Sequence, residues 1–120
     1  MVIILAALTL LPNTGLGAPF PDSKVSVEPH QAFTKDVITK RQECFIDYQL
    51  QTTAAIQAVD DFYQHEAQRE GEAVFDDSEN KFVDYRTVTF LKPRFMFIVL
   101  NRKDGSTTVK VSFKPKVNCG

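Results

Sequence analysis

The sequence is short of the residues from which nucleophilic and metal-dependent active sites are made. Its 120 residues include two histidines, His30 and His65, and two cysteines, Cys44 and Cys119. No glycine-rich phosphate loop occurs, and we interpret the acidic run Asp76–Glu79 as a solvated loop rather than a cation site. These shortages argue against a Ser-His-Asp or Cys-His nucleophile, and we expect neither a metal nor another cofactor.

Long hydrophobic runs are also scarce. The longest, "VIILAALTLL", covers Val2–Leu11 and is followed by helix breakers and small residues. A membrane span needs about 20 apolar residues, so this run is too short to cross a bilayer. It is typical of a secretory signal peptide over residues 1–18, cut after Gly17 or Ala18. We therefore expect a secreted protein that has no membrane association once the signal peptide is removed.

Residues 19–41 contain three prolines and show no sustained apolar periodicity. This composition favours a pro-peptide or a disordered spacer. The segment ends in Lys40-Arg41, a processing signal for dibasic proteases of the secretory pathway. A solvated pair of surface residues is the alternative. The mature domain would then comprise residues 42–120.

Secretion also affects the two cysteines, because disulfides persist in oxidising compartments. A metal site would need nearby histidines, and His65 is the sole histidine after residue 30. We therefore predict a disulfide between Cys44 and Cys119, close to the two ends of the mature domain. Closing so long a loop would stabilise the fold by about 4–5 kcal/mol in the chain-entropy model.

The mature part begins with one clear helical pattern. In residues 52–71, Ile56, Val59, Tyr63 and Ala67 recur at spacings of three and four, which predicts an amphipathic helix. Thr52 or Thr53 can cap its start, and Gly71 can end it.

Strand patterns follow the helix. Alternating or continuous apolar residues predict strands in residues 72–75, 82–91, 94–100 and 108–113, and Asp104-Gly105 predicts a hairpin turn. In the last strand Val109, Val111 and Phe113 are expected to face inward. The fold class is therefore α+β, with one N-terminal amphipathic helix packed on an antiparallel sheet of three to four strands.

Charge divides the mature chain. Residues 42–80 hold ten Asp or Glu and one Arg, whereas residues 81–120 hold nine Lys or Arg and two Asp. An acidic helix beside a basic sheet would compensate within the molecule. Alternatively, the basic residues form a surface that meets RNA phosphates. The candidates for such a surface are Arg86, Lys92, Arg94, Arg102, Lys103, Lys110, Lys114 and Lys116.

The order of cysteine, helix, strands, hairpin and second cysteine resembles the fungal ribonucleases of the T1 type. It is most similar to their catalytically inactive relatives, the RNase-like secreted effectors of plant-pathogenic fungi. The resemblance covers Cys44 to Gly120 and rests on "EC", "TTAAIQAVDDFYQHEAQREGE", "ENKFVDY", "FIVLNRKDG" and "VNCG". It implies the T1 fold and its disulfide between the region before the helix and the C-terminus.

The resemblance also implies that the catalytic set is lost. The family's first histidine would fall on Asn80, and its glutamate base on Arg86 or Thr87. Its arginine would fall near Phe97, and its second histidine near Ser112. RNA cleavage needs a general base and a general acid, and His65 lies on the polar side of the predicted helix.

We therefore expect a secreted, monomeric, non-catalytic RNase-like effector of virulence. It would bind a host protein or host RNA, outside or inside host cells, and no DNA. One alternative is an active secreted ribonuclease or cytotoxin that uses Glu79 or His65 with Arg86 or Arg94. A second is a cystatin-like protease inhibitor, although the cystatin Gln-x-Val-x-Gly signature is absent.

Overall fold

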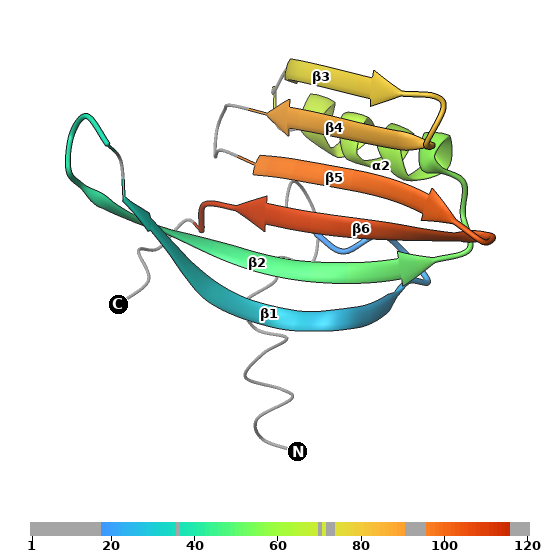
Figure 1. Ribbon diagram of the computed structural model, residues 1–120, viewed down its shortest axis with the longest axis horizontal. Coiled ribbons are helices and arrows are strands. Elements are labelled where there is room, and N and C mark those ends of the chain that lie inside the picture. Colours follow the sequence, from blue (N-terminus) through green and yellow to red (C-terminus); the bar gives the residue numbers. More distant parts are fainter. Residues whose placement is uncertain (1–17, 36, 70, 72–73, 91–95, 116–120) are drawn as a thin grey trace.

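A computed structural model describes residues 18–35, 37–69, 71, 74–90 and 96–115. Within these ranges the chain forms six strands and a helix, and all the strands join one antiparallel sheet in the order β1-β2-β6-β5-β4-β3 (Figure 1). The elements are β1 (Lys24–Lys35), β2 (Gln42–Thr52), α2 (Ile56–Arg69), β3 (Val74–Asn80), β4 (Tyr85–Phe90), β5 (Met96–Lys103) and β6 (Ser106–Phe113).

The predicted fold class is wrong. The helix α2 does not begin the domain but connects β2 to β3, and the sheet has six strands rather than three or four. The reason is a strand pattern in β2, where Ile46, Tyr48 and Leu50 are buried in alternation with more exposed residues. β2 pairs with β6, from Ile46 opposite Phe113 to Thr52 opposite Thr107. The T1-type arrangement of a leading helix and a smaller sheet does not describe this chain.

The expected disordered spacer also differs from the structure, because most of residues 19–41 belong to β1 and its hairpin loop. β1 pairs antiparallel with β2, from Lys24 opposite Gln51 to Lys35 opposite Gln42. Only Pro29 is buried in this strand, and proline is tolerated at a sheet edge. Backbone pairing rather than burial therefore orders the segment, which is why its composition gave no strand signal. Its removal as a pro-peptide stays a prediction.

The helix is confirmed, but it begins at a later residue than predicted. α2 begins at Ile56, and the Ala55 carbonyl accepts the N–H groups of Ala58 and Val59 at 3.1 and 3.3 Å. The Thr52 hydroxyl instead accepts the N–H of Ala54 at 3.2 Å, in the turn before the helix. Gly71 has the left-handed φ of 72° and donates its N–H to the Gln68 carbonyl at 3.1 Å, which ends α2 as predicted.

The β5–β6 hairpin is confirmed as well. Asp104 and Gly105 both have positive φ, at 53° and 76°, as a type I′ turn requires. β3 and β4 are shifted from the strands predicted at residues 72–75 and 82–91, because residues 81–84 form the β3–β4 turn. Asp76–Glu79 belongs to β3 and is not a loop, so acidic residues occupy this edge of the sheet.

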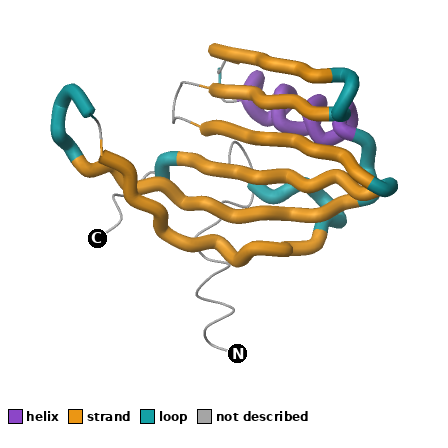
Figure 2. Tube along the Cα trace, in the orientation of Figure 1, coloured by secondary structure: helices purple, strands orange, loops and turns teal. Residues whose placement is uncertain are grey.

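One hydrophobic core lies between α2 and the sheet. α2 lies against one face, next to β4 and β5 (Figure 2). Val59, Tyr63 and Ala67 from α2 meet the buried side chains of the strands, which are Ile46, Tyr48, Leu50, Val88, Phe90, Met96, Ile98, Leu100, Val109, Val111 and Phe113. Among the described residues, no helix has the length and apolarity needed to cross a membrane.

The structure describes one of the two cysteines. Cys44 lies half-buried in β2, whereas Cys119 lies outside the described residues, so no disulfide joins two described residues. The pairing of Cys44 with Cys119 stays a prediction, and it would not join the two ends of the domain, because β1 precedes Cys44 in the same sheet.

Candidate binding groove on the open face of the sheet

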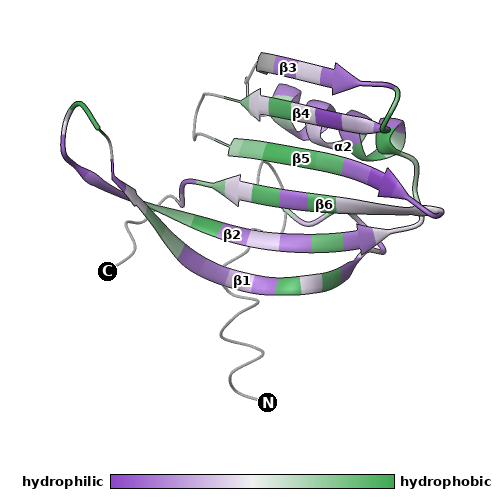
Figure 3. Cartoon of the chain, viewed as in Figure 1, coloured by the Kyte–Doolittle hydropathy of each residue, from purple (hydrophilic) through white to green (hydrophobic). Residues whose placement is uncertain are grey.

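The sheet has a covered face, against α2, and an opposite face that we call the open face. Successive side chains of a strand point to opposite faces, and Figure 3 shows this alternation in the hydropathy of β6, whereas the first part of β5 is apolar throughout. In β6, Val109 and Val111 are buried on the covered face, whereas Lys110 is exposed on the open face. Among the described elements, the helix α2 lies against the covered face (Figure 2).

Two adjoining hollows make a groove across the open face. The first, of about 330 Å³, is lined by residues that include Val27 and His30 of β1 and Phe97 of β5. The second, of about 660 Å³, continues toward the β5–β6 turn and Tyr85 of β4. The two hollows share Gln49, Val99 and Lys110. We call the whole the open-face groove; its remaining exposed or half-buried lining residues are Asp47, Gln51, Asn101, Lys103, Asp104, Ser106, Thr108 and Ser112.

The groove combines a small apolar floor with many uncharged hydrogen-bonding groups. Phe97 and Val99 are half-buried neighbours on the same face of β5. One amide is already held in place by two hydroxyls: the Gln51 side chain donates to Thr108 Oγ1 at 3.3 Å and accepts from Ser106 Oγ at 2.9 Å. Charges in the groove are balanced, because Lys103 and Lys110 are accompanied by Asp47 and Asp104.

A row of three polar residues crosses the groove on adjacent strands. His30 is opposite Asp47, and Asp47 is opposite Ser112. Ser112 Oγ donates to Asp47 Oδ1 at 2.6 Å, whereas His30 Nδ1 lies 2.9 Å from the Glu28 carbonyl oxygen. In a Ser-His-Asp triad the imidazole stands between the serine and the carboxylate, and here the carboxylate holds the middle position. The row can fix and orient a ligand through hydrogen bonds.

Part of this site was not predicted from the sequence. His30 was assigned to a segment without structure, so its place beside Asp47 depended on the pairing of β1 with β2. Alternation in β2 could have indicated that Asp47, Gln49 and Gln51 share one face. The expectation of no metal stays a prediction; among the described residues, no group of three or more His, Cys, Asp or Glu could hold an ion.

The positions aligned with the ribonuclease active site are only partly brought together. Phe97 and Ser112 are opposite each other on β5 and β6, and Thr87 is opposite Val99. These positions share the open face. Asn80 lies at the end of β3, where its side-chain oxygen accepts the Phe82 N–H at 3.1 Å.

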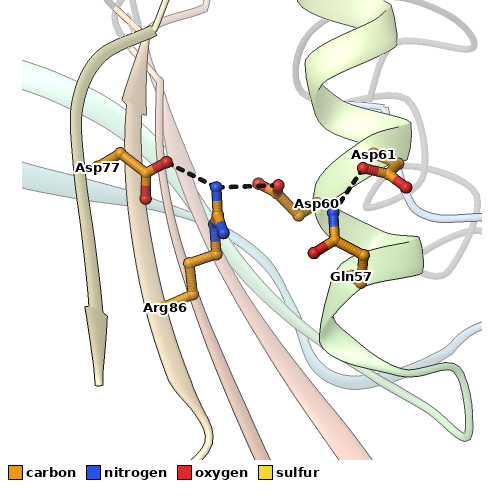
Figure 4. A network of polar contacts seen from close by, with 5 residues as sticks. All are labelled: Gln57, Asp60, Asp61, Asp77 and Arg86. Carbon is orange, nitrogen blue, oxygen red and sulfur yellow. Dashed lines mark hydrogen bonds and ion pairs between the residues drawn. The ribbon is translucent and has the colours of Figure 1, made fainter. Parts of the chain in front are cut away.

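Arg86 points to the covered face and connects three elements (Figure 4). Its Nη2 lies 2.6 Å from Asp77 Oδ2 on β3 and 3.2 Å from Asp60 Oδ2 on α2. Asp60 is only 3 % exposed. Burial raises the pKa of Asp60, and the Arg86 guanidinium opposes this shift only in part. Arg86 therefore joins the helix to the sheet edge.

Most of the other candidate cations also have partners within the molecule. Arg102 Nη1 donates to the Ala54 carbonyl and to Thr107 Oγ1, both at 2.7 Å, which holds the chain at the start of α2. Lys114 Nζ lies 3.2 Å from Glu43 Oε2. Lys92, Arg94 and Lys116 lie outside the described residues. Of the eight predicted phosphate ligands, the groove contains Lys103 and Lys110.

His65 is exposed on α2, away from the open-face groove. Comparison of the chain with protein families, with characterised proteins and with solved structures finds no match. The case for a function therefore rests on the groove and on the sequence patterns.

Proposed function

We propose that this protein is a secreted, non-catalytic binding protein that holds an extended segment of a partner protein in its open-face groove. The observation that carries this proposal is the lining of the groove: an apolar floor at Phe97 and Val99, surrounded by amides and hydroxyls and by balanced charges. An extended polypeptide offers backbone donors and acceptors to such amides and an apolar side chain to such a floor.

The charge distribution favours a protein partner over RNA. Phosphate binding draws on several unpaired lysines and arginines. In this structure Arg86 and Arg102 stabilise the covered face, and Lys114 pairs with Glu43. The remaining described candidates, Lys103 and Lys110, share the groove with two aspartates.

The contacts in the polar row support binding rather than catalysis. A serine nucleophile is activated when an adjacent base accepts its proton. Here the Ser112 hydroxyl is directed to the Asp47 carboxylate, and no described contact joins it to His30. The row therefore supplies fixed hydrogen-bonding groups to a ligand.

A pair of matched variants tests the proposal. A random-sequence peptide library displayed on phage would be selected on the immobilised chain. The selected peptides, and separately an oligouridylate, would then be titrated into wild type, Val99→Lys and Val83→Lys. Val83 is 59 % exposed in the β3–β4 turn and lies outside the groove, so the same substitution there is the control.

We expect Val99→Lys to weaken peptide binding at least about tenfold, which corresponds to about 1.4 kcal/mol, and Val83→Lys to leave it unchanged. Circular dichroism would verify that both variants fold. Equal peptide affinity in the two variants would contradict the groove as the site. Selection of no peptide, together with oligouridylate binding that weakens steeply with added salt, would replace the protein partner by RNA.

A further inference from the structure

The β1–β2 hairpin extends beyond the rest of the sheet. β2 pairs with β6 only from Ile46 onward, whereas β1 and β2 continue to pair up to Lys35 opposite Gln42. Residues 32–45 therefore form an arm, which Figure 1 shows projecting from one end of the sheet. Within the arm, Glu43 forms an ion pair with Lys114, the residue that follows β6.

The dibasic pair lies at the far end of this arm. Lys40 and Arg41 are exposed, as are the neighbouring Val37 and Ile38, which are 82 % and 90 % exposed. Lys40 has φ of 62°, in the left-handed region that non-glycine residues seldom adopt. An endoprotease binds its substrate as an extended chain, so the end of the arm must open before cleavage. The β1–β2 pairs next to the loop, such as Lys35 with Gln42, lie beyond the part of β2 that pairs with β6. Local opening is least costly there.

The chain before the arm is held to the domain by contacts that do not depend on the loop. The Phe20 ring packs edge-on against Phe62 of α2, with 5.4 Å between ring centroids. Ser23 Oγ donates to the Phe20 carbonyl at 2.6 Å, which fixes the local turn before β1, and Pro29 is buried within β1. β1 itself pairs with β2 along most of its length.

From these observations we propose that Arg41–Gln42 is a processing site in the folded protein and that the N-terminal piece remains bound after cleavage. Hydrolysis adds water across one peptide bond: the hydroxyl joins the Arg41 carbonyl carbon, the C–N bond breaks, and the proton goes to the new Gln42 amine. The product is a two-chain protein in which β1 stays paired with β2. Val27 and His30 accordingly stay in the open-face groove.

The molecule contains an internal control for this site. Arg102-Lys103 is a second adjacent basic pair, located at the end of β5. Its arginine is bound to the Ala54 carbonyl and Thr107 Oγ1, and both residues are paired with β6. Lys40 and Arg41 are thus exposed at the end of the arm, where the backbone can open locally. The backbone of Arg102 and Lys103 is instead held by its pairing with β6.

The test is proteolysis of the folded chain with a dibasic-specific endoprotease, followed by intact mass spectrometry and native size-exclusion chromatography. We expect one cut, after Arg41, and co-elution of both pieces as one species. Arg41→Gln should abolish the cut. The N-terminal piece contains no cysteine, so a disulfide cannot account for its retention. Resistance of the folded chain, under conditions that cut the heat-unfolded chain at Arg41, would overturn the processing site.

Matched variants test the retention. Phe20→Ala removes the ring that packs on Phe62, whereas Phe33→Ala removes a ring that is 53 % exposed on the arm. After cleavage, we expect Phe20→Ala to lose most of its N-terminal piece during chromatography and Phe33→Ala to keep it. Early elution of the N-terminal piece from cleaved wild type would overturn the two-chain product.

Discussion

The two faces of the sheet are formed by the same strands but perform different tasks. In β5, Leu100 is fully buried under α2, while its neighbour Val99 lies half-buried in the floor of the groove. The covered face joins helix and sheet through apolar packing, whereas the open face presents amides, hydroxyls and balanced charges. Alternation along a strand thus allows binding residues to change with little effect on the core.

The charged residues follow the same division. On the covered face, Arg86 has two carboxylate partners and reaches a nearly fully buried aspartate. On the open face, Lys110 is exposed to solvent beside the groove. Arg86 therefore contributes to the stability of the fold, whereas Lys110 is placed to contribute to ligand binding.

The largest expected effect comes from breaking the ionic contact of the covered face. Arg86→Met leaves Asp60 buried without its cation and should lower the free energy of unfolding by about 3–5 kcal/mol. The double variant Asp60→Asn, Arg86→Met should recover much of this loss, because it leaves no buried charge. Urea denaturation measures both. A double variant as unstable as Arg86→Met would show that the guanidinium acts mainly through Asp77.

A second experiment compares neighbouring residues on opposite faces. Leu100→Ala removes a fully buried side chain and should cost about 2–5 kcal/mol of unfolding free energy. Val99→Ala, one position earlier and on the open face, should cost about 1 kcal/mol or less. The readout is again denaturant unfolding. Similar losses in the two variants would mean that the open face is packed against something in the folded protein.

The smallest effect is a pH dependence that originates in Asp60. Its pKa is raised by burial above the ordinary value of 3.8, so the folded chain keeps this proton to a higher pH than the unfolded chain. Between the two pKa values the folded state binds more protons, and its free energy of unfolding therefore falls as pH rises.

Asp60→Asn isolates this contribution. The stability of wild type minus that of the variant should decrease as pH rises from 3.8 toward neutrality, as measured by urea unfolding in a series of buffers. The groups facing Asp60, namely Arg86, Asp77 and Asp61, are present in both proteins. A difference that is flat or increases with pH would contradict the raised pKa.

The predictable parts of the fold were those whose signals are local. The helical spacing of Ile56, Val59 and Tyr63 needs only the period of a helix, and Asp104-Gly105 needs only the backbone angles of a tight turn. β1 could not be found in this way, because its residues are mostly exposed and its order comes from pairing with β2. The total charge of the C-terminal part likewise did not reveal that Arg86 and Arg102 are directed inward.

By itself, the sequence determined the amphipathic helix, the β5–β6 hairpin and the alternation of β6, because each depends on residues close together in the chain. Tertiary structure alone decided that β1 and β2 extend the sheet and that His30, Asp47 and Ser112 form one row. It also decided that Lys40 and Arg41 are placed at the end of a projecting arm. These features depend on register between distant strands, and register is set by which faces the whole sheet can bury.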